Sequence, residues 1–251
     1  MARYDFSAQR LFVDASLTAS AEVRLRPEQA NYLLSVLRMR EGDRLWVFNG
    51  RDGEWLAEVA KATKKGAALS AIEQIRSQET GPDVEYCFAP LKHARLDYAV
   101  QKAVEMGARR LVPVLTKRTQ VSRVNVARMR ANVIEAAEQC GILAIPEVVE
   151  DMSLSAYLAD RSPDRLLVFC DEEAEVANPI DALRQTNRKP AADTALALLI
   201  GPEGGFDPRE RETLRAAPNV LPISLGPRIL RADTAAVAGL ALLQAVLGDW
   251  S

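Results

Sequence analysis

The chain has 251 residues, of which 48% are hydrophobic, and its 32 basic and 34 acidic residues give a net charge of -2. This composition excludes a disordered chain, and the near-neutral charge argues against a nucleic-acid binder that relies on a general positive field. The length predicts one large or two smaller domains. No apolar run approaches the roughly 18 residues of a membrane span, and Met1–Asp5 carries no apolar signal segment. We therefore expect a cytoplasmic protein without a membrane partner.

The few potential metal ligands are scattered along the chain. Cys87, Cys140 and Cys170 lie far apart in apolar or helical contexts, and His93 is the single histidine. Such cysteines are typical of free, mostly buried thiols in a reducing compartment. Because no Cys/His cluster has the spacing of a zinc site, we expect no metal.

Residues 1–76 predict a small domain that is rich in β structure. Short apolar or alternating runs predict strands at 10–13, 21–25, 44–48, 55–62 and 67–75, and helical spacing predicts a helix over 27–39. Several short strands that are joined by tight turns are typical of a small barrel. Residues 77–83 are polar and contain Gly81 and Pro82, which predicts a linker.

Residues 84–251 alternate between strand and helix patterns. Strands are expected at 84–90, 110–115, 165–170, 196–200 and 220–225, with helices at 96–106, 124–139, 154–158, from 208, and at 234–247. This alternation predicts an α/β domain with a mostly parallel sheet that helices cover on both faces. Ligands of such sheets bind beyond the carboxyl ends of strands, here at Cys170–Glu173, Gly201–Gly205 and Leu225–Arg231.

Two glycine-containing segments carry the candidate chemistry. Leu196–Phe206 reads as a buried strand and a glycine turn, and Asp207, Pro208 and Glu210 then form a capping-box helix start. It has neither Walker A nor dinucleotide-fold spacing, and alone it could be only a tight turn. Leu225–Ala235 adds a second glycine turn and leads into an alanine-rich helix. Its small residues predict close packing against a neighbouring element or a second copy of the chain.

Together these segments resemble the RsmE family of 16S ribosomal RNA uridine-N3 methyltransferases, which belongs to the SPOUT superfamily. The resemblance extends in chain order over nearly the whole sequence and is also carried by Val36–Asp43, Gln101–Gly107 and Glu135–Gly141. The chain departs from the common family pattern at Ile142, where many members have arginine. It also has Ala232 in place of threonine and Asp233 in place of glutamate.

The resemblance implies an N-terminal PUA-like RNA-binding β-barrel in residues 1–76 and a C-terminal SPOUT domain in 84–251. In that domain, a deep trefoil knot threads the segment from Leu225 to the last helix through a loop near Gly201–Gly205. It further implies S-adenosylmethionine as methyl donor, S-adenosylhomocysteine as product, and a homodimer through the C-terminal domain. The expected acceptor is N3 of a uridine in 16S ribosomal RNA, within the assembled small subunit. The alternatives are another RNA position, such as a ribose 2′-hydroxyl, or a non-catalytic RNA-binding assembly protein.

The resemblance and the strand-end argument together assign candidate site residues. Arg228 and Arg231 are the catalytic candidates because they could stabilise negative charge on the uracil carbonyl oxygens; phosphate contact or pairing with Asp233 is the alternative. Glu203 would place negative charge near a cationic donor or would only organise its loop. The full set of donor-binding candidates is Cys170, Ile200, Gly201, Pro202, Glu203, Gly204, Gly205, Leu225, Gly226, Ile229 and Leu230. The RNA-binding candidates are Arg10, Arg38, Arg40, Lys64, Arg118 and Arg123.

Overall fold

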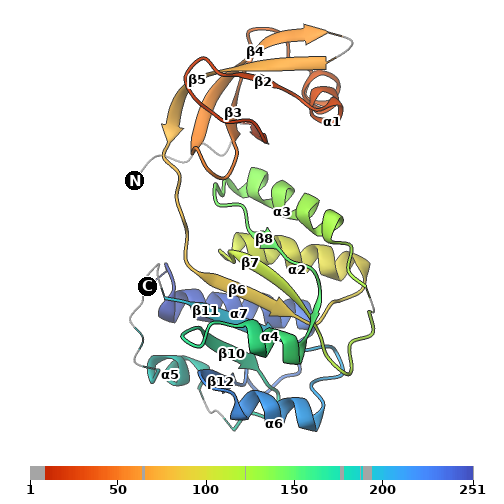
Figure 1. Ribbon diagram of the computed structural model, residues 1–251, viewed down its shortest axis with the longest axis vertical. Coiled ribbons are helices and arrows are strands. Elements are labelled where there is room, and N and C mark those ends of the chain that lie inside the picture. Colours follow the sequence, from red (N-terminus) through yellow and green to blue (C-terminus); the bar gives the residue numbers. More distant parts are fainter. Residues whose placement is uncertain are drawn as a thin grey trace. The chain divides into compact units, whose positions relative to one another are not determined.

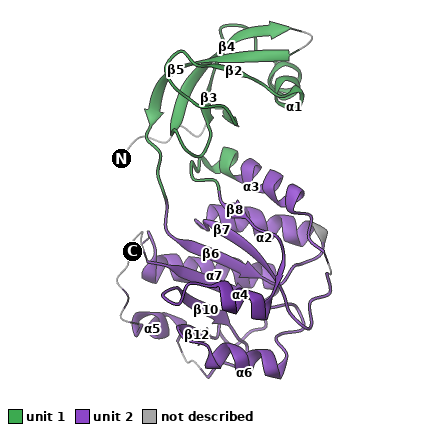
Figure 2. Ribbon diagram, in the orientation of Figure 1, with its two compact units in different colours: residues 1–80, 137–145 green, residues 81–136, 146–251 purple. Residues whose placement is uncertain are grey.

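The computed structural model describes residues 9–63, 66–121, 123–175, 178–186, 188 and 194–250. The chain divides into two compact units, residues 1–80 with 137–145 and residues 81–136 with 146–251 (Figure 2). Residues 137–145, which the sequence pattern places in the second domain, group with unit 1 in the structure. Two hydrogen bonds join this segment to the rest of unit 1. Phe12 N donates to Glu138 Oε1 at 2.8 Å, and Arg76 Nη1 donates to the Gly141 carbonyl at 3.1 Å.

Unit 1 is built on a five-stranded mixed sheet in the order β1-β3-β4-β5-β2 (Figure 1). Its strands are β1 (Arg10–Phe12), β2 (Glu22–Arg24), β3 (Arg44–Phe48), β4 (Glu54–Thr63) and β5 (Gly66–Arg76). Only β1 and β3 pair in parallel, and the other neighbours are antiparallel. Within the described residues β1 and β2 are the two edge strands, so the expected barrel is not closed by a ladder between them.

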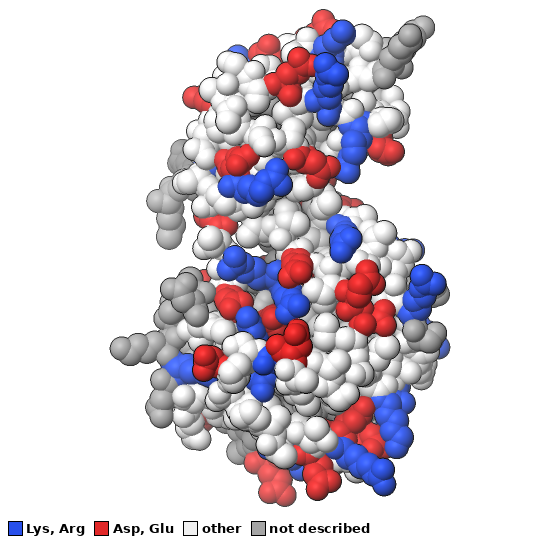
Figure 3. All heavy atoms as spheres, in the orientation of Figure 1, with Lys and Arg blue, Asp and Glu red and all other residues white. Residues whose placement is uncertain are grey.

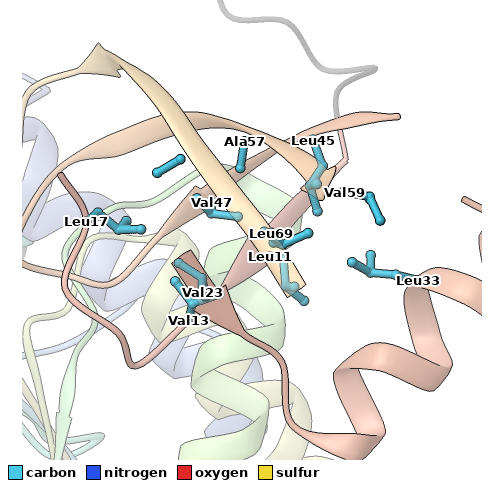
Figure 4. Packing of buried hydrophobic residues seen from close by; sticks show 11 residues of the cluster. Leu11, Val13, Leu17, Val23, Leu33, Leu45, Val47, Ala57, Val59 and Leu69 are labelled. Carbon is cyan, nitrogen blue, oxygen red and sulfur yellow. The ribbon is translucent and has the colours of Figure 1, made fainter. Parts of the chain in front are cut away.

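The helix expected over 27–39 is two short elements, the α-helix α1 (Pro27–Asn31) and the π-helix η1 (Tyr32–Val36). Pro27 suits the first helical turn, where no backbone N–H is needed. The Leu37 N–H bonds to the Tyr32 carbonyl at 2.9 Å, which is π-helical spacing, and Arg38 then takes a φ of 58°. This turn points Leu33 into an apolar core that strands β1 to β5 supply (Figure 4).

Unit 2 contains a seven-stranded sheet in which every neighbouring pair is parallel. The order is β12-β10-β11-β6-β7-β8, and β9 also pairs with β7 (Figure 1). The strands are β6 (Val84–Phe88), β7 (Arg110–Leu115), β8 (Glu147–Val148), β9 (Met152–Ser153), β10 (Leu166–Cys170), β11 (Leu196–Ile200) and β12 (Val220–Ile223). All five residues of β11 are buried, which explains its uninterrupted apolar sequence.

Helices cover both faces of this sheet, as the alternating pattern predicts. They are α2 (His93–Glu105), α3 (Val126–Cys140), α4 (Leu154–Asp160), α5 (Pro179–Arg184), α6 (Pro208–Ala216) and α7 (Ala232–Leu247). Ala197 and Leu199 of β11 share a core with residues of α4 and α6. The alternate residue, Leu198, faces α7: a Cβ on Gly239 would lie 2.9 Å from Leu198 Cδ2. The small residues of α7 therefore allow it to pack closely on the sheet.

Three short elements, α5, β8 and β9, have no counterpart in the sequence-based expectation. Each spans six residues or fewer, which is too short for a periodic pattern to be recognised. Among the described residues, no helix combines the length and the apolar character needed to cross a membrane.

Candidate active site

The carboxyl ends of three neighbouring strands bring the candidate loops together. Cys170, the last residue of β10, pairs in register with Ile200 of β11 and with Ile223 of β12. The segments that follow these residues enclose a cavity of ≈ 650 Å³. Its lining consists of Cys170, Asp171, Glu172, Pro202, Glu203, Gly204, Gly205, Ser224, Leu225, Gly226, Arg228, Ile229, Leu230, Arg231, Ala232 and Ala235.

The glycine loop after β11 is fixed by an aromatic side chain from its own end. The Phe206 ring is fully buried, contacts Phe169 edge to face at 5.5 Å between centroids, and lies against Gly201. A Cβ on Gly201 would lie 2.7 Å from a Phe206 ring carbon. Helix α6 then begins with the expected capping box, in which Asp207 and Glu210 satisfy each other's backbone N–H groups. Gly201 is thus required for the close approach of Phe206 to the backbone.

Gly201→Ala is expected to destabilise the protein by about 1–3 kcal/mol, because the added methyl group overpacks a closed core. The Phe206 ring has no free space to move into, so the loop that lines the cavity must shift and ligand affinity should fall as well. Urea unfolding together with ligand titration measures both effects. A variant with wild-type stability and affinity would show that this contact does not hold the loop.

A neighbouring loop, Thr116–Thr119 after β7, holds the same glycine loop from outside. The Lys117 N–H donates to Glu210 Oε1 at 2.7 Å, and Lys117 Nζ donates to Asp207 Oδ2 at 2.9 Å. The latter hydrogen bond is the main cause that lowers the pKa of Asp207. Arg118 Nη1 donates to the Gly204 carbonyl at 2.7 Å. Arg118, expected as an RNA contact, therefore also supports the glycine loop.

The end of β10 carries a network of carboxylates and arginines. The Asp171 side chain is completely buried and accepts hydrogen bonds from Arg211 Nε at 3.0 Å and Arg215 Nη2 at 2.8 Å. Arg211 also pairs with Glu172 at 2.5 Å and with Glu173 at 2.8 Å. Arg211 thereby fixes two carboxylates in the cavity wall. The sequence contains a signal for this network, because Arg211 and Arg215 lie one helical turn apart and an acidic run follows β10.

Glu203 lines the cavity, and its carboxylate has a partner that the sequence did not suggest. Asp207, not Glu203, caps the helix, and the Glu203 carboxylate pairs with Arg95 near the start of α2. Both side chains are about half exposed, at 47% and 41%. No sequence pattern connects these residues, which lie 108 positions apart.

Arg228 and Arg231 lie on the exposed side of the cavity. Neither side chain forms an ion pair or hydrogen bond to any described residue. The Asp233 carboxylate instead accepts a hydrogen bond from the Thr234 N–H at 2.9 Å, so the alternative of pairing between these arginines and Asp233 is not realised. Their guanidinium groups are free to meet an anionic or developing charge. Between them, Ile229 is 99% exposed and lies on the cavity rim.

The Cys170 thiol is half-buried in the cavity wall, and burial raises its pKa to about 12. A raised thiol pKa favours the neutral form, so the thiolate forms only as the pH approaches that value. Cys170 is therefore neither a nucleophile nor a charged group near neutral pH. We expect Cys170→Ala to leave the shape of the activity profile unchanged between about pH 6 and 9. A profile that loses an ionisation step in this variant would contradict this assignment.

Several predicted site residues have other surroundings than expected. Ile200 and Gly201 do not line the cavity: Ile200 is 3% exposed at the end of β11, and Gly201 packs on Phe206. Arg10 cannot serve as an RNA contact, because it is 8% exposed and donates to the buried Glu54 at 2.9 Å. Lys64 lies outside the described residues. The remaining RNA-binding candidates, Arg38, Arg40, Arg118 and Arg123, are exposed.

Among the described side chains, no group of three or more His, Cys, Asp or Glu is arranged to hold a metal ion. The cavity chemistry of the described residues therefore consists of backbone amides, carboxylates, arginines and apolar walls.

Comparison with known proteins identifies the chain. Residues 78–244 match the model of the RNA methyltransferase domain, and residues 25–72 match that of the RNA methyltransferase PUA domain. Ribosomal RNA small subunit methyltransferase E of Rickettsia conorii is 31% identical over 92% of this chain and 93% of its own length. The chain belongs to the RsmE family of RNA methyltransferases. Unit 2 contains the SPOUT-type methyltransferase domain, and unit 1 contains the PUA domain.

Further proteins are similar to this chain over almost all of its length. The methyltransferase E of Synechocystis is 32% identical over 96% of this chain and 78% of its own length. A methyltransferase of Legionella pneumophila, solved with the bound cofactor SAM, is 28% identical with a TM-score of 0.83 over 96% of this chain and 98% of that one. The methyltransferase E of Neisseria gonorrhoeae, bound to S-adenosyl methionine, is 25% identical with a TM-score of 0.83, over 97% and 100% of the two chains.

Proposed function

We propose that this methyltransferase transfers a methyl group from S-adenosylmethionine to N3 of a specific uridine in 16S ribosomal RNA of the small ribosomal subunit. The observation that carries the proposal is the ≈ 650 Å³ cavity beyond three parallel strand ends, whose rim presents two arginine side chains that pair with no described residue. S-adenosylmethionine is the ligand of two solved relatives of the same fold. The choice of uridine N3 rests on the resemblance to the RsmE family.

The cavity fits the donor in size and charge. Ligand sites of this kind usually have volumes of about 300–1,000 Å³. Glu172 and Glu203 place carboxylates in the wall, which suits a cationic ligand, and Leu225, Ile229 and Leu230 offer apolar contacts. Gly226, at φ +106°, and Gly205, at φ +68°, allow the backbone to turn where it lines the cavity. Once bound, the donor supplies a methyl group on a positively charged sulfur.

The residues of the cavity then have two roles: the arginines stabilise charge, and the loops align the reacting groups. The N3 proton passes to solvent and the methyl transfer releases S-adenosylhomocysteine. Loss of this proton leaves negative charge on the uracil ring, and Arg228 and Arg231 are placed to stabilise it on the flanking carbonyl oxygens. The loops hold the reacting groups in line, which contributes most of the acceleration in a single displacement without a covalent intermediate. Because base pairing hides N3, the acceptor uridine must be unpaired or flipped out of its stack.

RNA contact depends on local clusters of positive charge. On the face seen in Figure 3, basic and acidic side chains are interspersed over both units, in keeping with the net charge of -2. We assign RNA contacts to Arg38 and Arg40 in unit 1 and to Arg118 and Arg123 in unit 2, all exposed. Arg40 also lines a hollow of ≈ 770 Å³ in unit 1 between the α1 and η1 segment and the ends of β4 and β5. Without a general positive field, the protein is best suited to a preshaped surface such as the assembled small subunit.

The same proposal includes a deep trefoil knot, a homodimer through unit 2 and a cytoplasmic location. Strand order supports the knot: β12 lies at the sheet edge beside β10, yet the helix that follows it, α7, packs at Leu198 of the inner strand β11. The chain between them must therefore return towards the middle of the sheet beside the Gly201–Gly205 loop. The homodimer rests on the resemblance to the RsmE family, and Ile229, 99% exposed on the cavity rim, is a candidate interface residue.

Calorimetric titration with S-adenosylmethionine tests the enzyme against the non-catalytic alternative. We expect one donor site per chain, weaker binding by Gly201→Ala, and unchanged binding by Arg209→Gln, an exposed residue of α6 outside the cavity. Absence of donor binding by the wild-type chain would favour an RNA-binding protein that only keeps the fold.

A further inference from the structure

A second cavity, of ≈ 320 Å³, adjoins the donor cavity in unit 2. The two cavities share Pro202 and Glu203, so the glycine loop is the wall between them. The second cavity is lined by Pro90, Leu91, Lys92, Arg95, Arg118, Gln120, Val121, Pro202 and Glu203. Arg95 lies in the first turn of α2, and the other residues follow the ends of β6, β7 and β11, which places the cavity at the same edge of the sheet as the donor.

The charges of this second cavity are unbalanced. It contains three cationic side chains, Lys92, Arg95 and Arg118, and one carboxylate, Glu203. Glu203 pairs with Arg95, and Arg118 uses one nitrogen on the neutral Gly204 carbonyl. Lys92 is exposed, and its side chain forms no ion pair or hydrogen bond with any described residue. Two positive charges, those of Lys92 and Arg118, thus have no anionic partner among the described residues, in a concave site beside the reacting groups.

We propose that this cavity binds a phosphodiester group of the RNA next to the nucleotide that is methylated, an inference that rests on the proposed function. Guanidinium forks and an ammonium group are the usual phosphate ligands of proteins. The apolar side chains of Leu91 and Val121 can contact the adjoining ribose or base, and the Gln120 amide can donate to it and accept from it. An occupant of this cavity lies across a single loop from the methyl donor.

The Arg95–Glu203 pair makes this subsite responsive to its ligand. A phosphodiester competes with Glu203 for the Arg95 guanidinium, and both side chains are exposed enough to exchange partners. Glu203 belongs to both cavity walls, so its release from Arg95 adds negative charge on the side of the cationic donor. Binding of RNA and of donor should therefore favour each other.

Steady-state kinetics on small ribosomal subunits that lack the modification tests the subsite. We expect Lys92→Gln and Arg95→Gln each to raise the KM for subunits by about tenfold, the effect of one lost charged hydrogen bond. The kcat and the donor affinity of Lys92→Gln should change by less than about twofold, and its salt slope of RNA binding should fall by about 0.7. Arg184→Gln is the matched control, since Arg184 is 71% exposed on α5 and lies outside both cavities.

Glu203→Gln separates phosphate binding from a merely structural ion pair. If Arg95 only holds Glu203, then Arg95→Gln and Glu203→Gln should have the same effect. The phosphate subsite predicts opposite effects: Glu203→Gln frees Arg95 and lowers the KM for subunits, whereas Arg95→Gln raises it. Arg95→Lys keeps the charge and should recover part of the loss.

The two proposals fail in distinguishable ways. Wild-type KM and salt slope in both Lys92→Gln and Arg95→Gln would overturn the phosphate subsite while leaving the methyltransferase activity established. A wild-type chain that neither binds S-adenosylmethionine nor methylates the subunits would overturn the proposed function. Donor binding and methylation by the wild type are therefore measured before those of the variants.

Discussion

Replacing Arg231 with alanine is expected to lower the single-turnover rate of methyl transfer by about 10²–10³-fold, the usual effect of removing one donor that stabilises developing negative charge. Donor affinity should change by less than about threefold, because the interaction is made with the acceptor in the transition state. The Arg231 side chain has no described partner, and only its backbone caps α7. The substitution therefore removes a charge without removing an ion pair or a side-chain hydrogen bond to any described residue.

Rapid-mixing measurements at saturating donor, combined with donor titration, separate these two effects. Arg231→Lys is the matched variant: it keeps the charge but loses the planar fork, so its rate should lie between those of the wild type and the alanine variant. An unchanged rate in Arg231→Ala would refute the catalytic assignment. A loss confined to donor affinity would instead make Arg231 a part of the donor site.

The second large effect is expected for Arg211→Met, which should lower the free energy of unfolding by about 3 kcal/mol. Removal of one partner from a buried ion pair usually costs about 3–5 kcal/mol, because the other charge is left buried. The lower end applies here since Arg215 still pairs with the buried Asp171. Donor affinity should also fall, because Asp171 and Glu172 line the cavity and lose the side chain that holds them.

The loss in free energy of unfolding is measured by urea unfolding, monitored with a probe in unit 2. The probe lies in unit 2 because two units need not unfold in one transition. Arg209→Gln, on the same helix and exposed, is the control and should lie within about 0.5 kcal/mol of the wild type. A midpoint for Arg211→Met that equals that of Arg209→Gln would show that the network is not a stabilising element.

The sequence predicts the layout of unit 2 well because its signals are local. Buried apolar runs mark the strands, the Asp207 capping box marks the start of α6, and parallel topology gathers the strand ends at one edge. In unit 1 the same reasoning misses the π-helix from Tyr32 to Val36, whose hydrogen-bond spacing leaves no periodic signature over five residues.

The candidate site is predicted less completely, since its decisive contacts are long-range. Arg95 meets Glu203 across 108 positions, and Arg211 meets Asp171 across 40. For Arg10 the sequence suggests exposure where the structure shows burial. Its position near other basic residues suggests an exposed RNA contact, but a buried carboxylate 44 positions away holds it inside the fold. The loops are therefore predictable here, whereas the long-range partners of Arg10 and Arg95 are not.

These contacts give the glycine loop a more definite role than its sequence suggests. Phe206 fixes it from within, Arg118 holds its Gly204 carbonyl, and Arg95 binds its Glu203 carboxylate. A short loop that is held at three points can form a stable wall between a donor cavity and a cationic one. Catalysis by alignment requires such rigidity, because misplacement by about 1 Å can cost 10²-fold in rate.

Mass mapping of modified nucleosides in 16S ribosomal RNA tests the central claim most directly. RNA from a strain without this gene should lack one N3-methyluridine, and expression of the wild-type chain should restore it, whereas Arg231→Ala should restore it poorly. An N3-methyluridine that persists in the deleted strain, or a loss confined to a ribose 2′-O-methyl group, would contradict the account.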